Sequence, residues 1–176
     1  MTNQLIVDQL EIKLLSDKAT MPTRDRLDAG YDIYSAETVI LEPQEKAVIK
    51  TDVAVNIPEG YVGLLTSRSG VSSKTHLVIE TGKIDAGYQG NLGINIKNDV
   101  DERYRKLKST TYLNIKDECV ERDYHDTKKL NSYKIYKGDK LAQLVIVPIW
   151  TPELKEVEEF QTESERGEKG FGSTGY

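Results

Sequence analysis

The chain has 176 residues, of which 38% are hydrophobic and 30% charged, and its formal net charge is −5 at pH 7. This length predicts one domain with a substantial core, and the negative charge argues against binding nucleic acid through an extended basic surface. A single cysteine, Cys119, excludes an internal disulfide and fits a reducing compartment, and the two histidines argue against a His/Cys zinc site.

The first part of the chain has the pattern of short strands. Segments 10–15, 47–57 and 61–66 are rich in Val, Ile and Leu and are broken by turn residues. One short helix is expected after Ser69, where "SGVSSK" offers capping residues.

Two later segments also predict strands. In 92–98, Leu92, Ile94 and Ile96 alternate with small or polar residues, which is typical of a half-buried strand. Segment 140–149 is almost entirely apolar, so we expect a central strand covered on both faces. Together these segments predict an all-β fold, a sandwich or jelly roll.

The composition changes near residue 99. Segment 99–135 is dense in charges of both signs, lacks Gly and Pro, and contains Tyr104, Tyr112, Tyr124 and Tyr133. We expect an inserted, ordered subdomain at 99–135 with an exposed amphipathic surface. A core formed by 1–98 and 136–161 would flank it, and a polar, Gly-rich C-terminal arm would follow at 162–176.

Two segments suggest a phosphate or metal site. "AGYDIYSAE" at 29–37 places Asp32 near a tight turn, although a plain turn and strand explains the same residues. "SRSG" at 67–70 follows a strand and gathers the guanidinium of Arg68, the hydroxyl of Ser69 and the backbone N–H of Gly70. These groups suit a phosphate, and a capped helix with a surface arginine is the alternative.

Two further segments have polar residues in unusual places. "TGKIDAGYQGNLG" at 81–93 holds Asp85 in a bend too Gly-rich to need an acid for packing, and Tyr88 could lie flat against a sugar. An ordinary turn remains the alternative. Gln143 is the one polar residue in an apolar strand, and it needs partners because an unpaired buried amide costs about 1–3 kcal/mol.

The tail "RGEKGFGSTGY" at 166–176 is not a P-loop, because no Lys-[Ser/Thr] pair follows the required glycine spacing. As an arm it could cover a base with Phe171 and hold phosphate oxygens with Arg166, Ser173 and Thr174. A disordered tail is the alternative reading of the same composition.

Taken in order, these five segments resemble the five motifs of the homotrimeric dUTPases, over residues 20–98 and 138–176. The resemblance implies a jelly-roll subunit, a homotrimer, and active sites built from more than one chain. It implies hydrolysis of dUTP to dUMP and pyrophosphate with Mg²⁺, which limits uracil incorporation into DNA and supplies dUMP for dTMP synthesis.

The resemblance also implies a role for each matching residue. Asp85 corresponds to the base that activates water, Tyr88 to the ring under the deoxyribose, and Asp32 to a carboxylate that reaches Mg²⁺ through water, the ion being held mainly by the substrate phosphates. Backbone groups that read uracil belong to Gly82 and Gly93. The phosphate-binding set is Arg68, Ser69, Gly70 and Gln143, and the arm that closes over the site of another subunit carries Arg166, Phe171, Gly172, Ser173 and Thr174. The arm departs from the family at Lys169, where glycine is usual.

Other functions stay open at this stage. A dCTP deaminase of the same fold is the nearest enzymatic alternative, and a regulatory protein-binding module is another. The 99–135 insert resembles that of staphylococcal phage dUTPases, some of which bind a repressor of mobile genetic elements, so a repressor could bind through the insert and the active-site region. The insert could equally decorate or stabilise the trimer. We expect no direct nucleic acid binding, no membrane association, and a cytoplasmic protein (in the host cell if phage-encoded).

Overall fold

The computed structural model describes residues 9–101, 111–121, 130–162, 164 and 167. The described chain contains short strands and one short helix, α1, at Ser69–Lys74, as expected from the sequence. The strands are β1 Glu11–Leu14, β2 Tyr31–Tyr34, β3 Val39–Leu41, β4 Lys46–Lys50, β5 Val53–Asn56, β6 Tyr61–Ser67, β7 Leu77–Ile79, β8 Gly82–Ile84, β9 Gly93–Asn98, β10 Thr111–Leu113, β11 Cys119–Glu121, β12 Tyr133–Ile135 and β13 Lys140–Pro148.

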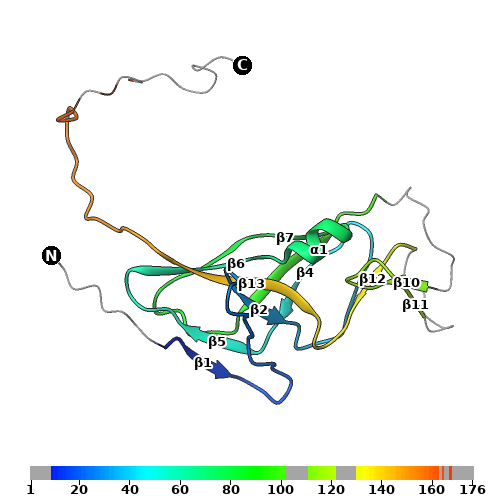
Figure 1. Ribbon diagram of the computed structural model, residues 1–176. Helices are drawn as coiled ribbons and strands as arrows, with labels where there is room; N and C mark the ends of the chain where they lie inside the picture. Colours follow the sequence, from blue (N-terminus) through cyan, green and yellow to red (C-terminus); the bar gives the residue numbers. More distant parts are fainter. Residues whose placement is uncertain (1–8, 102–110, 122–129, 163, 165–166, 168–176) are drawn as a thin grey trace.

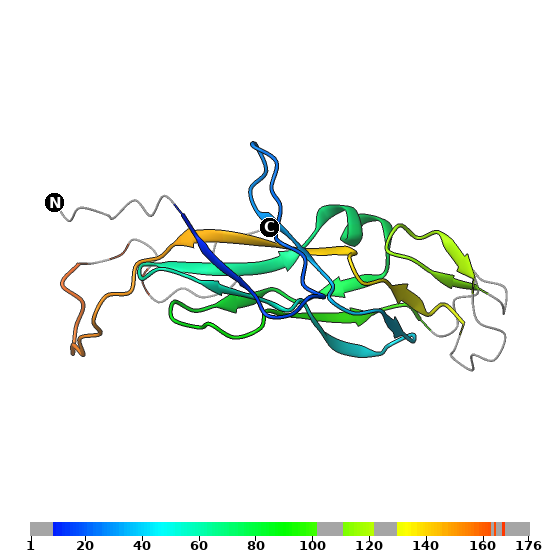
Figure 2. The same ribbon diagram turned by 90° about the horizontal axis from the view of Figure 1, so that it is seen from below.

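The strands form an elongated, layered β structure (Figures 1 and 2). Four sheets have the strand orders β2-β13-β6-β8, β4-β9-β7, β11-β10-β12-β3 and β1-β5. Between the layers lies a single apolar core that includes Ile33, Leu65, Ile94 and Ile96, each at most 2% exposed. The alternation predicted for 92–98 is confirmed, because Leu92, Ile94 and Ile96 are buried, whereas Gly93 is exposed and Asn95 and Lys97 are half-buried.

The apolar segment predicted as one strand at 47–57 is two strands in two different sheets. β4 pairs with β9, whereas β5 pairs with β1. The chain changes sheets at Thr51 and Asp52, where Asp52 adopts a left-handed φ of 53°. A single extended strand cannot pass through that conformation, so the ladder breaks there.

β13 is central, as expected, since it pairs with β2 on one side and with β6 on the other. Leu141, Ala142 and Leu144 are buried. The expectation that the whole strand is covered on both faces is wrong for its second half, where residues 145–147 are only half-buried and Pro148 is exposed. In both views the chain leaves the body after β13 (Figures 1 and 2).

The described part of segment 99–135, which the sequence predicted to be an insert, extends the sheet that begins at β3. β12 pairs antiparallel with β3, and β10 pairs parallel with β12 through Leu113 and Tyr133. Tyr112 and Tyr133 are 1% and 0% exposed. These two tyrosines are therefore core residues, which corrects the expectation of a tyrosine-rich surface; Tyr104 and Tyr124 lie outside the described residues.

No helix in the described ranges has the length and apolarity needed to cross a lipid bilayer.

Candidate active site

The first cluster of predicted site residues lies where β6 ends and α1 begins. Arg68 is the residue before the helix, and its Nε donates a hydrogen bond at 2.7 Å to Oδ1 of Asp32 on β2, which β13 separates from β6 in the same sheet. No hydrogen bond of the described residues uses the two terminal nitrogens of Arg68. Because Asp32 binds the guanidinium only through Nε, the two terminal nitrogens are free to form a bidentate contact with an anion.

Asp32 is held by a second cation that the sequence analysis did not identify. Lys140, at the start of β13, donates from Nζ to Asp32 Oδ2 at 2.9 Å and also lies over the Tyr34 ring, 5.6 Å from its centroid. Burial alone raises the pKa of Asp32, but the hydrogen bonds and charges of Lys140 and Arg68 outweigh it and hold that pKa below its usual value. The cluster carries one negative and two positive charges and so favours an anionic ligand.

Gln143 belongs to the same cluster through the sheet register. It lies directly opposite Asp32 on β2 and opposite Thr66 on β6, so the three side chains share one face of the sheet. Gln143 is half-buried, and its amide makes no hydrogen bond to another described residue. A polar side chain without a partner beside Arg68 is suited to bind a ligand oxygen.

Ser69 and Gly70 open helix α1. Neither of their backbone N–H groups is used in a hydrogen bond within the described chain, as is normal for the first helical turn. An added Cβ at Gly70 would meet no atom within 4 Å, so this chain's own packing does not require glycine there. The open space is available to a ligand instead.

The second cluster lies in segment 81–93, where the sequence predicted a hairpin. That prediction is wrong in its pairing, because β8 pairs with β6 whereas β9 pairs with β4 and β7. The segment is a turn that connects two sheets, and it is called the hairpin below only for its bent shape. Asp85 begins its turn, accepts a hydrogen bond from Tyr88 N at its carbonyl, and leaves its exposed carboxylate without a hydrogen bond or ion pair in the described chain. Gly87 has a φ of 84°, which explains the glycine in this turn. The Tyr88 side chain is 46% exposed, so Asp85 and the ring both face outward.

Gly82 and Gly93 lie at the two roots of this hairpin, as first residues of β8 and β9. The nearest atom to an added Cβ at Gly82 would be 3.8 Å away, whereas at Gly93 the Cγ1 of the exposed Val48 would be 2.6 Å away. Packing within this chain therefore does not require glycine at position 82, and the missing side chain leaves the backbone there open to a planar ligand.

The two clusters lie at opposite ends of β6, as the path of that strand in Figures 1 and 2 makes visible. β8 pairs antiparallel with β6, with Ile84 opposite Gly63, so Asp85 lies beyond that pair while Arg68 lies five residues further along β6 in the other direction. Asp85 is thus six positions along β6 from Arg68, and at about 3.4 Å per residue this separates the two by roughly 20 Å. One nucleotide triphosphate cannot place its α-phosphorus beside both groups of the same chain.

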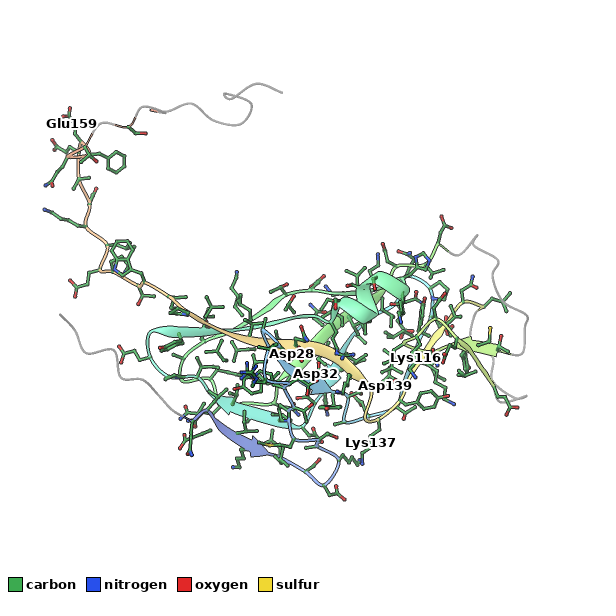
Figure 3. The ribbon with its side chains drawn as sticks, in the orientation of Figure 1. Asp28, Asp32, Lys116, Lys137, Asp139 and Glu159 are labelled. Carbon is green, nitrogen blue, oxygen red and sulfur yellow. The ribbon has the colours of Figure 1, made fainter. Side chains whose placement is uncertain are left out.

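The described residues do not form a site for a bare Mg²⁺. No group of three or more His, Cys, Asp or Glu side chains among them could hold a metal ion. Figure 3 shows Asp32 within the body of the fold, and both of its oxygens are occupied by cationic side chains. The donor set therefore fits an ion that arrives with the phosphates of a ligand better than an ion held by protein alone.

The arm residues Arg166, Phe171, Gly172, Ser173 and Thr174 lie outside the described residues, as does Lys169. The segment that leads to them is described to residue 162. Figure 3 places Glu159 far from the body of the subunit, and Trp150, Leu154 and Phe160 are 87%, 98% and 89% exposed.

Known proteins share this chain's sequence pattern. The dUTPase family model matches residues 17–105 and 127–175. The human mitochondrial deoxyuridine 5'-triphosphate nucleotidohydrolase is 36% identical over 168 residues, which cover 95% of this chain and 55% of that protein. The mouse enzyme of the same name is 35% identical over 162 residues, covering 92% of this chain and 82% of its own length.

Solved structures agree with these matches. The dUTPase of Staphylococcus bacteriophage 80alpha with dUPNHPP is 69% identical and has a TM-score of 0.89. The match covers 96% of this chain and 99% of that one. The dUTPase of phage phi11 of S. aureus, solved to visualise its species-specific insert, is 66% identical with a TM-score of 0.82, covering 89% of this chain and 100% of its own. A phi11 variant reveals the coordination of a structural Mg(II) ion. The predicted all-β jelly roll is thereby confirmed.

Proposed function

This chain belongs to the dUTPase family and is a dUTP-hydrolysing enzyme, and from that premise we propose that its two separated clusters form one active site between two copies of the chain. The observation that carries the proposal is the antiparallel register of β6 and β8, which keeps Asp85 and Arg68 apart within one chain. A second copy brings its own Arg68 cluster to the hairpin, which a homotrimer with cyclic symmetry does three times over.

The phosphate end binds and orients the triphosphate. Arg68 offers two free nitrogens, Gln143 an unpaired amide, and Ser69 and Gly70 two backbone N–H groups. Asp32, which Lys140 also bonds, holds Arg68 in place before the substrate arrives, so little is lost in ordering the arginine on binding. Asp32 would reach Mg²⁺ through water when the substrate phosphates carry the ion, and the ion would supply positive charge against the phosphate oxygens.

The hairpin end supplies the base and the reading of the nucleoside. The exposed Asp85 carboxylate takes a proton from water as that water attacks the α-phosphorus, and dUMP and pyrophosphate leave. The backbone at Gly82 and Gly93 reads the uracil edge, and Tyr88 lies under the deoxyribose, where a 2′-hydroxyl would collide with the ring. A base or sugar that leaves buried polar groups unpaired is rejected strongly.

The C-terminal arm then closes over the site of another copy. The exposed apolar side chains between β13 and the arm support this proposal, because no described residue of their own subunit covers them. Phe171 covers the base, and Arg166, Gly172, Ser173 and Thr174 hold phosphate oxygens. Closure excludes bulk water and strengthens the electrostatic contacts. The activity limits uracil in DNA and supplies dUMP, in the cytoplasm of the cell that makes the protein.

Product analysis tests the proposal. The purified chain is incubated with dUTP, dCTP or dTTP in the presence of Mg²⁺, and again after chelation. We expect pyrophosphate and dUMP from dUTP alone, with activity lost on chelation and restored by Mg²⁺. Ammonia released from dCTP would identify a deaminase of the same fold, and pyrophosphate from dTTP would contradict the specificity assigned to the hairpin.

A second role, binding a repressor of a mobile genetic element, has weaker support. Phage dUTPases, that of phage 80alpha among them, control transfer of virulence genes by a G protein-like mechanism. In this chain Leu130 of segment 99–135 and the adjacent Tyr136 are 40% and 37% exposed and are available to a partner. Leu130→Asp leaves the buried Tyr112 and Tyr133 in place, so it should keep dUTP hydrolysis and weaken repressor binding in a pull-down with purified repressor; unchanged binding would exclude this surface as the contact.

A further inference from the structure

The structure points to Asp52 as a residue that positions Tyr88 from outside the active site, and therefore as a determinant of the selection for deoxyribose over ribose. We propose this on the basis of a chain of hydrogen bonds that begins at the junction of β4 and β5 and ends on the Tyr88 ring. The inference rests on the proposed role of Tyr88 beneath the sugar.

Asp52 and Asn91 form a reciprocal pair. Asp52 N donates to Asn91 Oδ1 at 3.0 Å, and Asn91 Nδ2 donates back to Asp52 Oδ1 at 2.8 Å. The Thr51 hydroxyl donates to the next carbonyl along, that of Leu92, at 2.8 Å. The last residues of the catalytic hairpin are therefore fixed to the β4–β5 junction by side chains as well as by backbone.

Asn91 in turn holds the ring. The Tyr88 hydroxyl donates to the Asn91 carbonyl oxygen at 3.0 Å, while Tyr88 N is bonded to the Asp85 carbonyl. An added Cβ at Gly90 would lie 2.5 Å from the Tyr88 oxygen, so the ring folds closely over the hairpin backbone. Tyr88 is thus held by its backbone N–H and by its hydroxyl, and the position of the hydroxyl depends on where Asn91 lies.

Asp52 is itself held on its far side. Its second oxygen, Oδ2, accepts a hydrogen bond from the Ser16 hydroxyl at 2.6 Å, and its carbonyl accepts one from Leu15 N at 2.8 Å. The hydrogen bonds from Ser16 and Asn91 hold the pKa of Asp52 below its usual value, so the carboxylate accepts them in its charged form near neutral pH. The pair is therefore anchored to the segment that follows β1.

The backbone alone does not explain an aspartate at this position. Asp52 has a φ of 53°, a conformation that glycine adopts without steric cost. Aspartate and asparagine also tolerate this region better than most residues, so the backbone does not choose among the three. The contacts with Asn91 and Ser16 favour the carboxylate, because each of its two oxygens accepts one of these hydrogen bonds.

The test compares dUTP with UTP. Asp52→Gly keeps the left-handed backbone accessible and removes only the carboxylate. We expect kcat/KM for dUTP to fall about three- to tenfold and the preference for dUTP over UTP to fall by a similar factor. The reason is that the Tyr88 ring is no longer held in one position beneath the sugar. Gln44→Gly is the matched control: Gln44 also has a positive φ, 65°, and donates one side-chain hydrogen bond, to the Val100 carbonyl. It should leave the preference unchanged.

Two further variants make the outcome decisive. Tyr88→Phe removes only the bond to Asn91, so Asp52→Gly combined with Tyr88→Phe should cost no more selectivity than Tyr88→Phe alone. Additive losses would overturn the proposal. Asp52→Asn also tolerates a positive φ and retains part of the pairing with Asn91. It should therefore keep more selectivity for dUTP than Asp52→Gly does, and it replaces that variant in the comparison if Asp52→Gly folds poorly.

A readout without turnover separates this inference from the proposed function. In the nucleotide-free protein, NMR signals of the Tyr88 ring should move or broaden in Asp52→Gly and stay unchanged in Gln44→Gly. Unchanged Tyr88 signals in a folded Asp52→Gly protein would contradict the inference, even if dUTP hydrolysis is normal. Failure of the wild-type protein to discriminate UTP would instead contradict the role of Tyr88 beneath the sugar.

Discussion

The two ends of β6 hold their functional groups by different physical means. At the Arg68 end, a buried carboxylate is shared between a guanidinium and an ammonium at 2.7 and 2.9 Å. At the Asp85 end, the carboxylate is exposed and unpaired in the described chain, and its neighbour Tyr88 is held by uncharged hydrogen bonds. The first end is prepared for anionic phosphate, whereas the second leaves its carboxylate free to take up a proton.

Substitution at the hairpin end should have the largest effect. Asp85→Asn keeps the size and the backbone contacts of the residue but removes the base, so turnover should fall at least about a hundredfold while dUTP binding is retained. Steady-state kinetics together with calorimetric titration of a non-hydrolysable analogue measure both quantities. Near-normal turnover would remove Asp85 from the chemistry and leave the contrast between the two ends without a catalytic meaning.

Substitution at the phosphate end should affect both binding and stability. Asp32→Asn leaves Arg68 and Lys140 without their shared anion, and we expect the free energy of unfolding to fall by about 1–3 kcal/mol. KM for dUTP should rise, because Arg68 is no longer oriented, while turnover at saturating substrate changes less. Urea unfolding and kinetics check these outcomes, with Lys140→Met as the companion variant that removes only one of the two cations. An Asp32→Asn protein with unchanged KM would show that Arg68 needs no support.

Acid should distinguish the two ends as well. The folded-state pKa of Asp32 is below its ordinary value of 3.8, with burial opposing the shift and the Lys140 and Arg68 hydrogen bonds and charges causing it. A carboxylate with a lowered pKa contributes stability above its ordinary pKa and loses that contribution as the pH falls through the folded value. The difference in unfolding free energy between wild type and Asp32→Asn should therefore be constant from about pH 8 to pH 5 and shrink below about pH 4. A difference that grows in acid would reverse the assignment.

The smallest effect is expected at an ion pair that belongs to neither end. Lys46 and Glu80 are 2.7 Å apart, but their side chains are 50% and 53% exposed. Lys46→Ala should change the free energy of unfolding by less than about 1 kcal/mol and leave dUTP kinetics unchanged. A larger loss would mean that charge pairs in this protein do not differ by burial, which would weaken the comparison made for Asp32.

The sequence predicted the groups at each end better than their relation in space. Glycines near Asp85 and Tyr88 indicate a turn because few other residues permit its backbone. The short helix after Arg68 was also predicted, although the capping residues expected there make no side-chain cap hydrogen bond and Arg68 itself is the N-cap. Lys140 was missed because its contact with Asp32 depends on the pairing of β13 with β2. The separation of Arg68 from Asp85 depends on strand register in the same way.

Two other features depended on interactions that no local pattern specifies. The break between β4 and β5 occurs at Asp52, whose conformation is held by Ser16 and Asn91, residues distant in the chain. The tyrosines of segment 99–135 stand among many charged residues, yet Tyr112 and Tyr133 are buried where β10 and β12 join the sheet of β3. Burial of this kind is decided by tertiary packing rather than by residue type.

The most direct measurement mixes two inactive chains. Asp85→Asn and Arg68→Ala proteins are purified, shown to be folded, unfolded together in equal amounts and refolded, and their dUTP turnover is compared with that of each protein refolded alone. If one active site takes Asp85 from one copy and Arg68 from another, random trimers should regain activity at about a quarter of their sites. Activity no greater than the sum of the two separate proteins would contradict a site shared between copies.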